Sequence, residues 1–171
     1  MLFLQKSVQK FYFSSLEKFQ KIRCRLPGLF EGLNSTIFTH GATGSGKTYT
    51  MHGKGNSGKD GIAGMSIQTL IDICVQRPGQ YRLQFSMFEI HRDRIRDLLR
   101  TDEAAFDLPM REDFWKTMQI ANLTQMELSD LETLMKIYFT ALGRRQVGKT
   151  QLNEESSRSH CCLRVEEKIK M

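Results

Sequence analysis

The stretch Gly41-Ala42-Thr43-Gly44-Ser45-Gly46-Lys47-Thr48 decides the fold of this chain of 171 residues. It carries the glycines, the lysine and the hydroxyl of the phosphate-binding pattern G-x-x-x-x-G-K-[ST]. The β-branched and aromatic run at 34–39 predicts a buried strand before this loop, and residues 47–51 predict the first turns of a helix after it. Strand, glycine loop and helix in this order predict an α/β fold that binds a phosphorylated ligand.

The predicted loop suits a triphosphate because it concentrates hydrogen-bond donors and positive charge without steric crowding. Its glycines allow successive backbone N–H groups to point at phosphate oxygens, and the following helix directs its positive end to the same place. Lys47 is predicted to contact the β- and γ-phosphates, and the Thr48 hydroxyl to bind Mg²⁺. The predicted phosphate-binding residues are Gly41, Ala42, Thr43, Gly44, Ser45, Gly46, Lys47 and Thr48.

The overall composition is that of a globular protein, with 40% hydrophobic and 26% charged residues. The net charge of +6 predicts attraction to an acidic partner such as nucleic acid, an anionic membrane or an acidic protein polymer, although a solvated basic surface explains it equally well. The four cysteines form no C-x-x-C pair, which favours reduced thiols in an intracellular protein. No apolar stretch is long enough to span a membrane, and the apolar start at residues 1–4 is too short for a signal peptide.

Strand and helix patterns alternate along the rest of the chain. A helix beginning near Met65 is predicted to bury one stripe of residues, namely Ile67, Leu70, Ile71 and Cys74. The run 81–90 predicts a strand with one face formed by Leu83, Phe85, Met87 and Glu89, and a short helical segment is predicted around Ile95, Leu98 and Leu99.

Two further strands are predicted between 106 and 128, around Trp115. A capping box at Ser129 and Glu132 then predicts a helix that ends at Gly143 and buries Leu131, Leu134, Met135, Tyr138 and Leu142. The alternation indicates an α/β fold of the P-loop NTPase class, with a central mostly parallel or mixed sheet and flanking helices. We expect a poorly defined segment at 1–28 and one nucleotide-binding domain at 29–171.

Three segments resemble the motor domain of the kinesin superfamily. Residues 34–51 are similar to its strand, phosphate loop and T-x-T-M extension. The run Phe88-Glu89-Ile90, followed by Ile95-Arg96-Asp97-Leu98-Leu99, resembles its F-E-I and I-R-D-L-L motifs. Asn153-Glu154-Glu155-Ser156-Ser157-Arg158-Ser159-His160 matches its switch I motif, N-x-x-S-S-R-S-H. The resemblance covers most of Leu29 to Val165 and identifies the domain at 29–171 as a partial kinesin-like motor.

This resemblance implies roles for individual residues. Asn153 and Ser156 are expected to contact the γ-phosphate and position the attacking water, and Ser157 to help hold Mg²⁺. Arg158 is expected to pair with a glutamate of the family's switch II motif, and Tyr49 to place its ring against adenine. Phosphoryl transfer needs such positioning and charge neutralisation more than a covalent nucleophile.

The resemblance also implies ATP and Mg²⁺ as cofactors and microtubules (tubulin) as the partner. The expected function is an ATPase that couples hydrolysis to movement along, or binding of, microtubules in the cytoplasm and on the cytoskeleton. No membrane and no nucleic acid is expected to be bound directly.

The sequence departs from the family pattern after switch I. No D-x-A-G-S-E motif follows His160 in these 171 residues, although the family's γ-phosphate sensor lies there. We therefore expect the chain to cover about half of a motor domain and to be inactive or very slow by itself.

Two alternatives remain open from the sequence. The first is a truncated, catalytically inactive remnant that interacts with nucleotide or with microtubules. The second is another P-loop enzyme. It is disfavoured, because a GTPase needs an N-K-x-D motif and a small-molecule kinase needs an arginine-rich lid, and the sequence shows neither.

Overall fold

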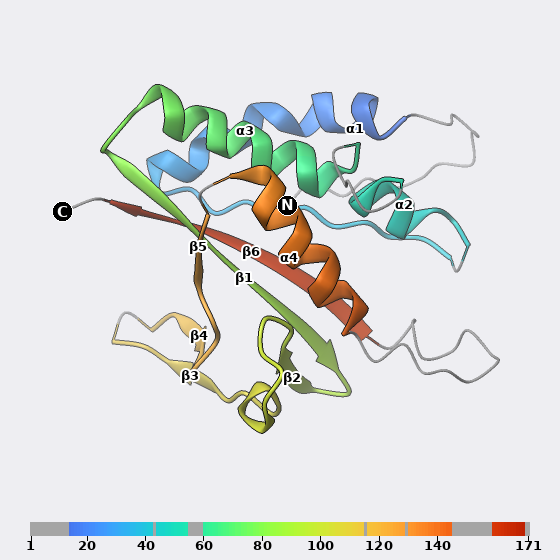
Figure 1. Cartoon of the computed structure of the whole chain (residues 1–171), viewed down its shortest axis with the longest axis vertical. Coiled ribbons are helices and arrows are strands. Elements are labelled where there is room, and N and C mark those ends of the chain that lie inside the picture. Colours follow the sequence, from blue (N-terminus) through green and yellow to red (C-terminus); the bar gives the residue numbers. More distant parts are fainter. Residues whose placement is uncertain are drawn as a thin grey trace. The chain divides into compact units, whose positions relative to one another are not determined.

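The computed structural model describes residues 14–42, 44–54, 60–114, 116–128, 130–144 and 159–169. Helices come first along this part of the chain, strands follow, and one more helix and one more strand come last (Figure 1). In chain order the elements are α1 (Ser15–Ile22), η1 (Arg23–Glu31), α2 (Lys47–His52), α3 (Ile62–Gln76), β1 (Tyr81–His91), β2 (Arg94–Asp97), η2 (Glu103–Ala105), β3 (Met110–Glu112), β4 (Met118–Ile120), β5 (Met126–Leu128), α4 (Leu131–Gly143) and β6 (Ser159–Ile169). The described residues divide into two compact units. The first takes in residues up to 82, 130–135 and 167–169, and the second takes in 83–128 and 136–166.

A capping box begins α1 in the first unit. The Ser14 hydroxyl accepts a hydrogen bond from Glu17 N at 3.2 Å, and Glu17 Oε2 accepts one from Ser14 N at 2.6 Å. These hydrogen bonds to the carboxylate hold the pKa of Glu17 below its ordinary value. The helix buries Phe19 and Ile22, so a region whose sequence pattern is weak forms regular structure.

The predicted strand at 34–39 is not formed, which corrects the sequence-based expectation. Residues 33–40 belong to no helix or strand, and Phe38 is 46% exposed. Figure 1 shows this segment as a long uncoiled trace between η1 and α2. A strand needs a neighbour for its backbone hydrogen bonds, and no strand of the described part of the chain pairs with this segment.

The helix α3 confirms the predicted helical stripe in part. Ile67 and Leu70 are buried, whereas Ile71 and Cys74 are half-buried. The helix begins at Ile62, three residues before the expected start, and packs against α1, η1 and α2. No helix in the described ranges combines the length and the apolar character needed to cross a bilayer.

The sheet of the second unit is built on antiparallel pairs. Its strand order is β2-β1-β5, and β6 also pairs with β1. Phe88 lies opposite Asp97 in β2, and Phe85 lies opposite Met126 in β5, both in antiparallel register. The pair β3–β4 is antiparallel as well, with Met110 opposite Ile120. The expectation of a sheet with flanking helices holds, but the mostly parallel or mixed pairing predicted for the sheet is not seen, because these three pairs are antiparallel.

The antiparallel pairing of β1 and β2 has a local cause. His91 pairs with Arg94, so only Arg92 and Asp93 connect the two strands. Both have positive φ angles, 49° and 65°, as the central residues of a tight hairpin turn require. This hairpin also replaces the helical segment predicted around Ile95, because Ile95 lies within β2.

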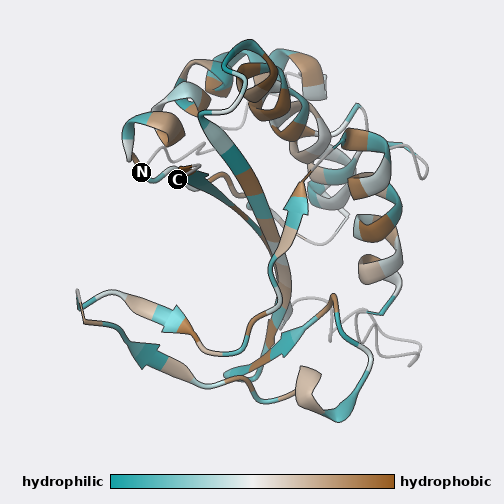
Figure 2. Cartoon of the chain, turned by 60° about the vertical axis from the view of Figure 1, so that its left-hand side comes forward, coloured by the Kyte–Doolittle hydropathy of each residue, from teal (hydrophilic) through white to brown (hydrophobic). Residues whose placement is uncertain are grey.

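The side chains of β1 form the core of the second unit. The predicted face of Leu83, Phe85, Met87 and Glu89 is buried, as expected. In Figure 2 brown hydrophobic and teal hydrophilic stretches succeed one another along the β1 ribbon. On the opposite face Phe88 packs in a cluster with Ile95 and Leu108, against which Ile90, Ile120, Leu123 and Cys162 also pack. Of the residues predicted to be buried in α4, Leu134, Met135 and Tyr138 are buried, whereas Leu131 and Leu142 are half-buried. Thr133 N donates to Asp130 Oδ1 at 2.8 Å. Ser129, the predicted N-cap, lies outside the described residues.

A buried carboxylate joins β2 to the turn before β5. Asp97 has no exposed surface. Its Oδ1 accepts a hydrogen bond from Leu99 N, and its Oδ2 accepts one from Thr124 N, both at 2.8 Å. A buried polar group stabilises a fold only when it is paired, and both carboxylate oxygens of Asp97 meet that condition.

Replacing Asp97 by alanine is expected to lower the free energy of unfolding by about 2–4 kcal/mol, because two backbone N–H groups lose their acceptor. Asp97→Asn should cost less, since its amide retains one acceptor oxygen. Urea denaturation measures both. Asp107→Asn is the control, because the interaction found for Asp107 among the described residues is an exposed ion pair with Arg94 at 3.6 Å, and its loss should change stability little. Equal losses for Asp97→Ala and the control would contradict the proposed role of Asp97.

Candidate nucleotide-binding site

The predicted phosphate loop lies between the uncoiled segment at 33–40 and α2, in the first unit. Gly44 and Gly46 have φ angles of 78° and 84°, a backbone region that glycine adopts without strain. At Gly41 a side chain would meet Ser45, whose Oγ lies 2.5 Å from where a Cβ would stand. Gly44 and Gly46 therefore occupy positions whose backbone conformation favours glycine. Thr43 lies outside the described residues.

Lys47 turns back over this loop. Its Nζ donates hydrogen bonds to Gly41 O and Ala42 O, both at 2.8 Å. Ser45 N also donates to Ala42 O, at 3.1 Å. Two of the three hydrogens of the ammonium group are thus used by loop carbonyls, and the positive charge is held at the loop.

The short helix α2 exposes two of the predicted site residues. Thr48 is exposed, and the Tyr49 ring is 47% exposed, with Lys54 Nζ 5.9 Å from its centroid. Thr50 points the other way: it is buried, and its hydroxyl accepts a hydrogen bond from Lys18 Nζ of α1 at 3.2 Å. This contact was not predicted, since Lys18 belongs to no sequence motif.

The junction between α2 and α3 is a close approach of two backbone segments. The helix α2 ends at Gly53, whose φ is 80°, and α3 begins after Gly61. A Cβ on Gly61 would lie 2.6 Å from both Gly53 N and Met51 O. Lys54 N donates to the Asp60 carboxylate at 3.2 Å. Gly61 therefore allows α3 to start directly beside the end of α2.

The structure does not place the predicted switch I residues. Asn153, Ser156, Ser157 and Arg158 lie outside the described residues, and β6 begins just after them at Ser159. The residues that the structure brings together are those of the loop and of α2. How they relate to the switch I residues stays a prediction.

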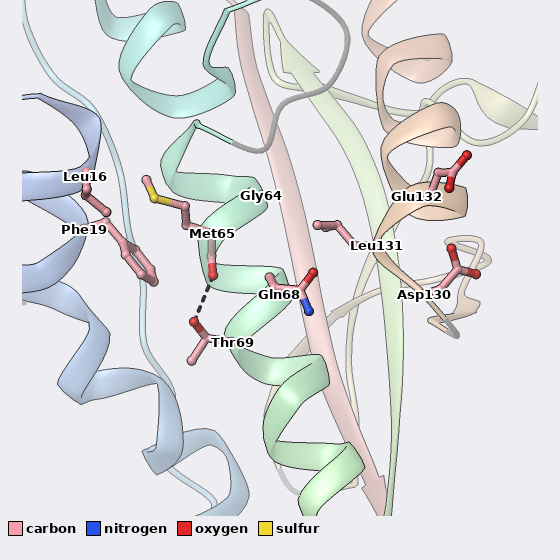
Figure 3. A pocket seen from close by; sticks show the side chains of 9 residues that line it. All are labelled: Leu16, Phe19, Gly64, Met65, Gln68, Thr69, Asp130, Leu131 and Glu132. Carbon is pink, nitrogen blue, oxygen red and sulfur yellow. Dashed lines mark hydrogen bonds between the residues drawn. The ribbon is translucent and has the colours of Figure 1, made fainter.

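A groove of about 610 Å³ lies elsewhere in the first unit (Figure 3). Leu16 and Phe19 of α1 line one side of it, and Met65 and Gln68 belong to α3. Asp130 and Glu132, at the start of α4, add two carboxylates. None of the predicted nucleotide-binding residues lines this groove, so it is separate from the loop site.

Comparison with known proteins decides the family. The family model of the kinesin motor domain matches residues 5–170. The chain belongs to the kinesin motor domain family. Kinesin-like protein KIN-10C from Oryza sativa subsp. japonica is 35% identical to this kinesin over 147 residues, which cover 85% of the chain.

Solved kinesin structures share the fold of this kinesin chain. The structure of a fast kinesin matches with a TM-score of 0.79 and 26% identity, over 91% of this chain and 45% of that one. The motor domain of KAR3 from Saccharomyces cerevisiae matches with a TM-score of 0.71 and 30% identity, over 90% of this chain and 46% of that one. The P-loop NTPase fold class predicted from the sequence is therefore confirmed.

This kinesin chain spans part of the length of its relatives. It covers 24% of KIN-10C and just under half of the two solved structures. The family match begins at residue 5, before the segment that resembles the family most clearly in the sequence.

The close approach at Gly61 gives a prediction. Gly61→Ala is expected to lower the free energy of unfolding by about 1–3 kcal/mol, because its new methyl group would meet backbone atoms that cannot move aside cheaply. Thermal unfolding measures the change. Gly143→Ala is the matched control: nothing lies within 4 Å of the added carbon, and the position ends α4. The control should be neutral or slightly stabilising, and a comparable loss there would contradict the role given to Gly61.

Proposed function

We propose that this kinesin-family chain binds ATP with Mg²⁺ at Gly41–Thr48. The observation that carries the proposal is the position of Lys47. Its ammonium group donates hydrogen bonds to two carbonyls of the loop, in which Gly44 and Gly46 have positive φ angles. An ammonium group held at a glycine loop suits the charge of a polyphosphate. The family match supports a nucleotide as the ligand.

The neighbouring residues fit the parts of this nucleotide. Thr48 follows the lysine and is exposed, so its hydroxyl is available as a Mg²⁺ ligand. We propose that the exposed ring of Tyr49 stacks against adenine. Asn153, Ser156, Ser157 and Arg158 are proposed to complete the site, with Ser157 as the second protein ligand of Mg²⁺. When bound, Mg²⁺ neutralises charge that develops on the phosphate oxygens.

We further propose that the chain acts with microtubules, as part of a motor that couples ATP hydrolysis to microtubule binding or movement. Family membership and the net charge of +6 support this proposal, because the microtubule surface is acidic. The proposed location is the cytoplasm, on the microtubule cytoskeleton. The alternative is a chain that binds nucleotide or microtubules without hydrolysing ATP. Repeated hydrolysis of ATP by the purified chain, measured as released phosphate, contradicts that alternative.

Lys47→Ala is expected to weaken binding of Mg·ATP at least about 100-fold, because the main cation of the loop is lost. Isothermal titration with ATP and with GTP measures binding and tests the base preference. Arg25→Ala is the control, since Arg25 is an exposed cation in the same unit and its loss changes the net charge equally. If Lys47→Ala binds ATP as tightly as wild type, the loop is not the site.

Microtubule binding is expected to weaken as salt rises, because the attraction between a basic chain and an acidic polymer is screened. Co-sedimentation with stabilised microtubules between 25 and 200 mM KCl (~20 and ~7 Å Debye lengths) measures the effect. A neutral polysaccharide polymer serves as the control for nonspecific pelleting. Binding that does not change with salt would contradict an electrostatic microtubule contact.

A further inference from the structure

A lysine of α1 holds the inner face of α2. Lys18 Nζ donates a hydrogen bond to Thr50 Oγ1 at 3.2 Å, from a residue 32 positions earlier in the chain. Thr50 is buried, with 8% of its surface exposed. Both residues belong to the first unit. A hydrogen bond whose donor is charged is stronger than one between neutral groups, so this contact is a firm link between the two helices.

The helix that carries Lys18 is itself well fixed. The capping box of Ser14 and Glu17 satisfies the start of α1, and Lys18 N donates to Ser14 O at 3.2 Å. Phe19 and Ile22 are buried, and α1 packs against α3. The helix α2, in contrast, has only six residues and is too short to be stable without outside contacts. The contact therefore transfers order from α1 to α2.

The contact sets the rotation of α2 about its own axis. Successive residues of an α-helix are turned by about 100°, so residues two apart lie on nearly opposite faces. Thr50 is buried, and Thr48 is exposed. Thr50 N donates to Gly46 O at 2.9 Å, which closes the first turn of the helix around Lys47 and Thr48. Holding the Thr50 hydroxyl on the inner face therefore holds the Thr48 hydroxyl on the outer face.

We propose that Lys18 and Thr50 are positioning residues for the Mg²⁺ contact of Thr48. This inference rests on the proposed Mg·ATP site. Neither residue belongs to the phosphate loop, and their effect is preorganisation: fewer orientations of α2 are open, so less entropy is lost when the Thr48 hydroxyl engages the ion. The hydrogen bonds of Lys47 are made to carbonyls of the loop. Loss of the Lys18 contact should therefore affect the metal more than the nucleotide.

The test measures two quantities on the 171-residue chain, with a fluorescent ADP as the probe. One is the affinity for ADP in EDTA, and the other is the Mg²⁺ concentration at half-maximal response when ADP is saturating. Lys18→Met should raise that Mg²⁺ concentration roughly fivefold, because the competent orientation of Thr48 is populated less. The affinity for ADP in EDTA should stay within about twofold. Thr50→Val should give the same pattern, and the double variant should lose little more, because both changes break one contact.

Arg23→Met is the matched control. Arg23 is an exposed cation at the start of η1 in the same unit, so its loss changes the net charge as Lys18→Met does. It should leave both quantities unchanged. Thr50→Ser retains the hydroxyl acceptor and should keep most of the wild-type response to Mg²⁺. The comparison of Thr50→Ser with Thr50→Val decides the question if Lys18→Met does not fold by circular dichroism.

Each other outcome overturns the proposal. Weaker ADP binding in EDTA with an unchanged response to Mg²⁺, or equal losses of both, indicates a general structural role, and no change in either indicates no role. If wild type binds ADP with Mg²⁺ and Lys47→Ala does not, such results reject the lysine–threonine pair and leave the ATP site standing. If wild type binds no ADP, the proposed ATP site fails and the positioning role fails with it.

Discussion

The backbone ladder of β1 is the constraint on which the second unit depends. The strands β2, β5 and β6 each pair with β1, and the side chains of residues 85–89 are buried. A backbone segment that has no access to water must satisfy its N–H and C=O groups within the protein. An interruption of β1 would therefore expose unsatisfied groups on three neighbours at once. The three strands that pair with β1 are therefore held by its continuity.

Paired polar groups then determine how the segments around the sheet are placed. Asp97 accepts two backbone hydrogen bonds, and Arg96, its neighbour, donates one to Arg144 O. On β6, Arg164 donates to Gln119 of β4 and forms an ion pair with Glu166. Hydrophobic packing has little directional preference, whereas each of these bonds is made in only one arrangement. They connect β2, α4 and the β3–β4 hairpin to the sheet in a defined way.

In the first unit, the feature that depends on packing is the position of the Lys47 ammonium group beside the glycine loop. The helix that carries Lys47 has only six residues, too few to be stable in isolation. Its support comes from packing against α3, from the close approach at Gly61 and from the bond between Lys18 and Thr50. The proposed nucleotide chemistry therefore depends on contacts that lie outside the motif itself.

Local patterns in the sequence were sufficient for the elements whose cause is local. The buried face of β1, the start of α2 at Lys47 and the family could be predicted, because side-chain alternation and the glycine-lysine motif act over a few residues. The capping box at Ser14 and Glu17 follows the same S-x-x-E pattern as the one predicted at Ser129, so α1 could have been predicted as well. The helical expectation around Ile95 was wrong, because the turn at Arg92 and Asp93 returns the chain as a hairpin.

By itself, then, the sequence determined the phosphate loop, the family and the apolar strand at the centre of the sheet. Each of these depends on a pattern of residues that lie close together in the chain. Only the tertiary structure decided that residues 34–39 form no strand, that β1 pairs antiparallel with β2 and β5, and that Arg96 meets Arg144. These features depend on which distant segment supplies a partner for a backbone or side-chain group. Hydrogen bonds between residues that lie 46 or 48 positions apart produce no periodic sequence pattern from which they could be predicted.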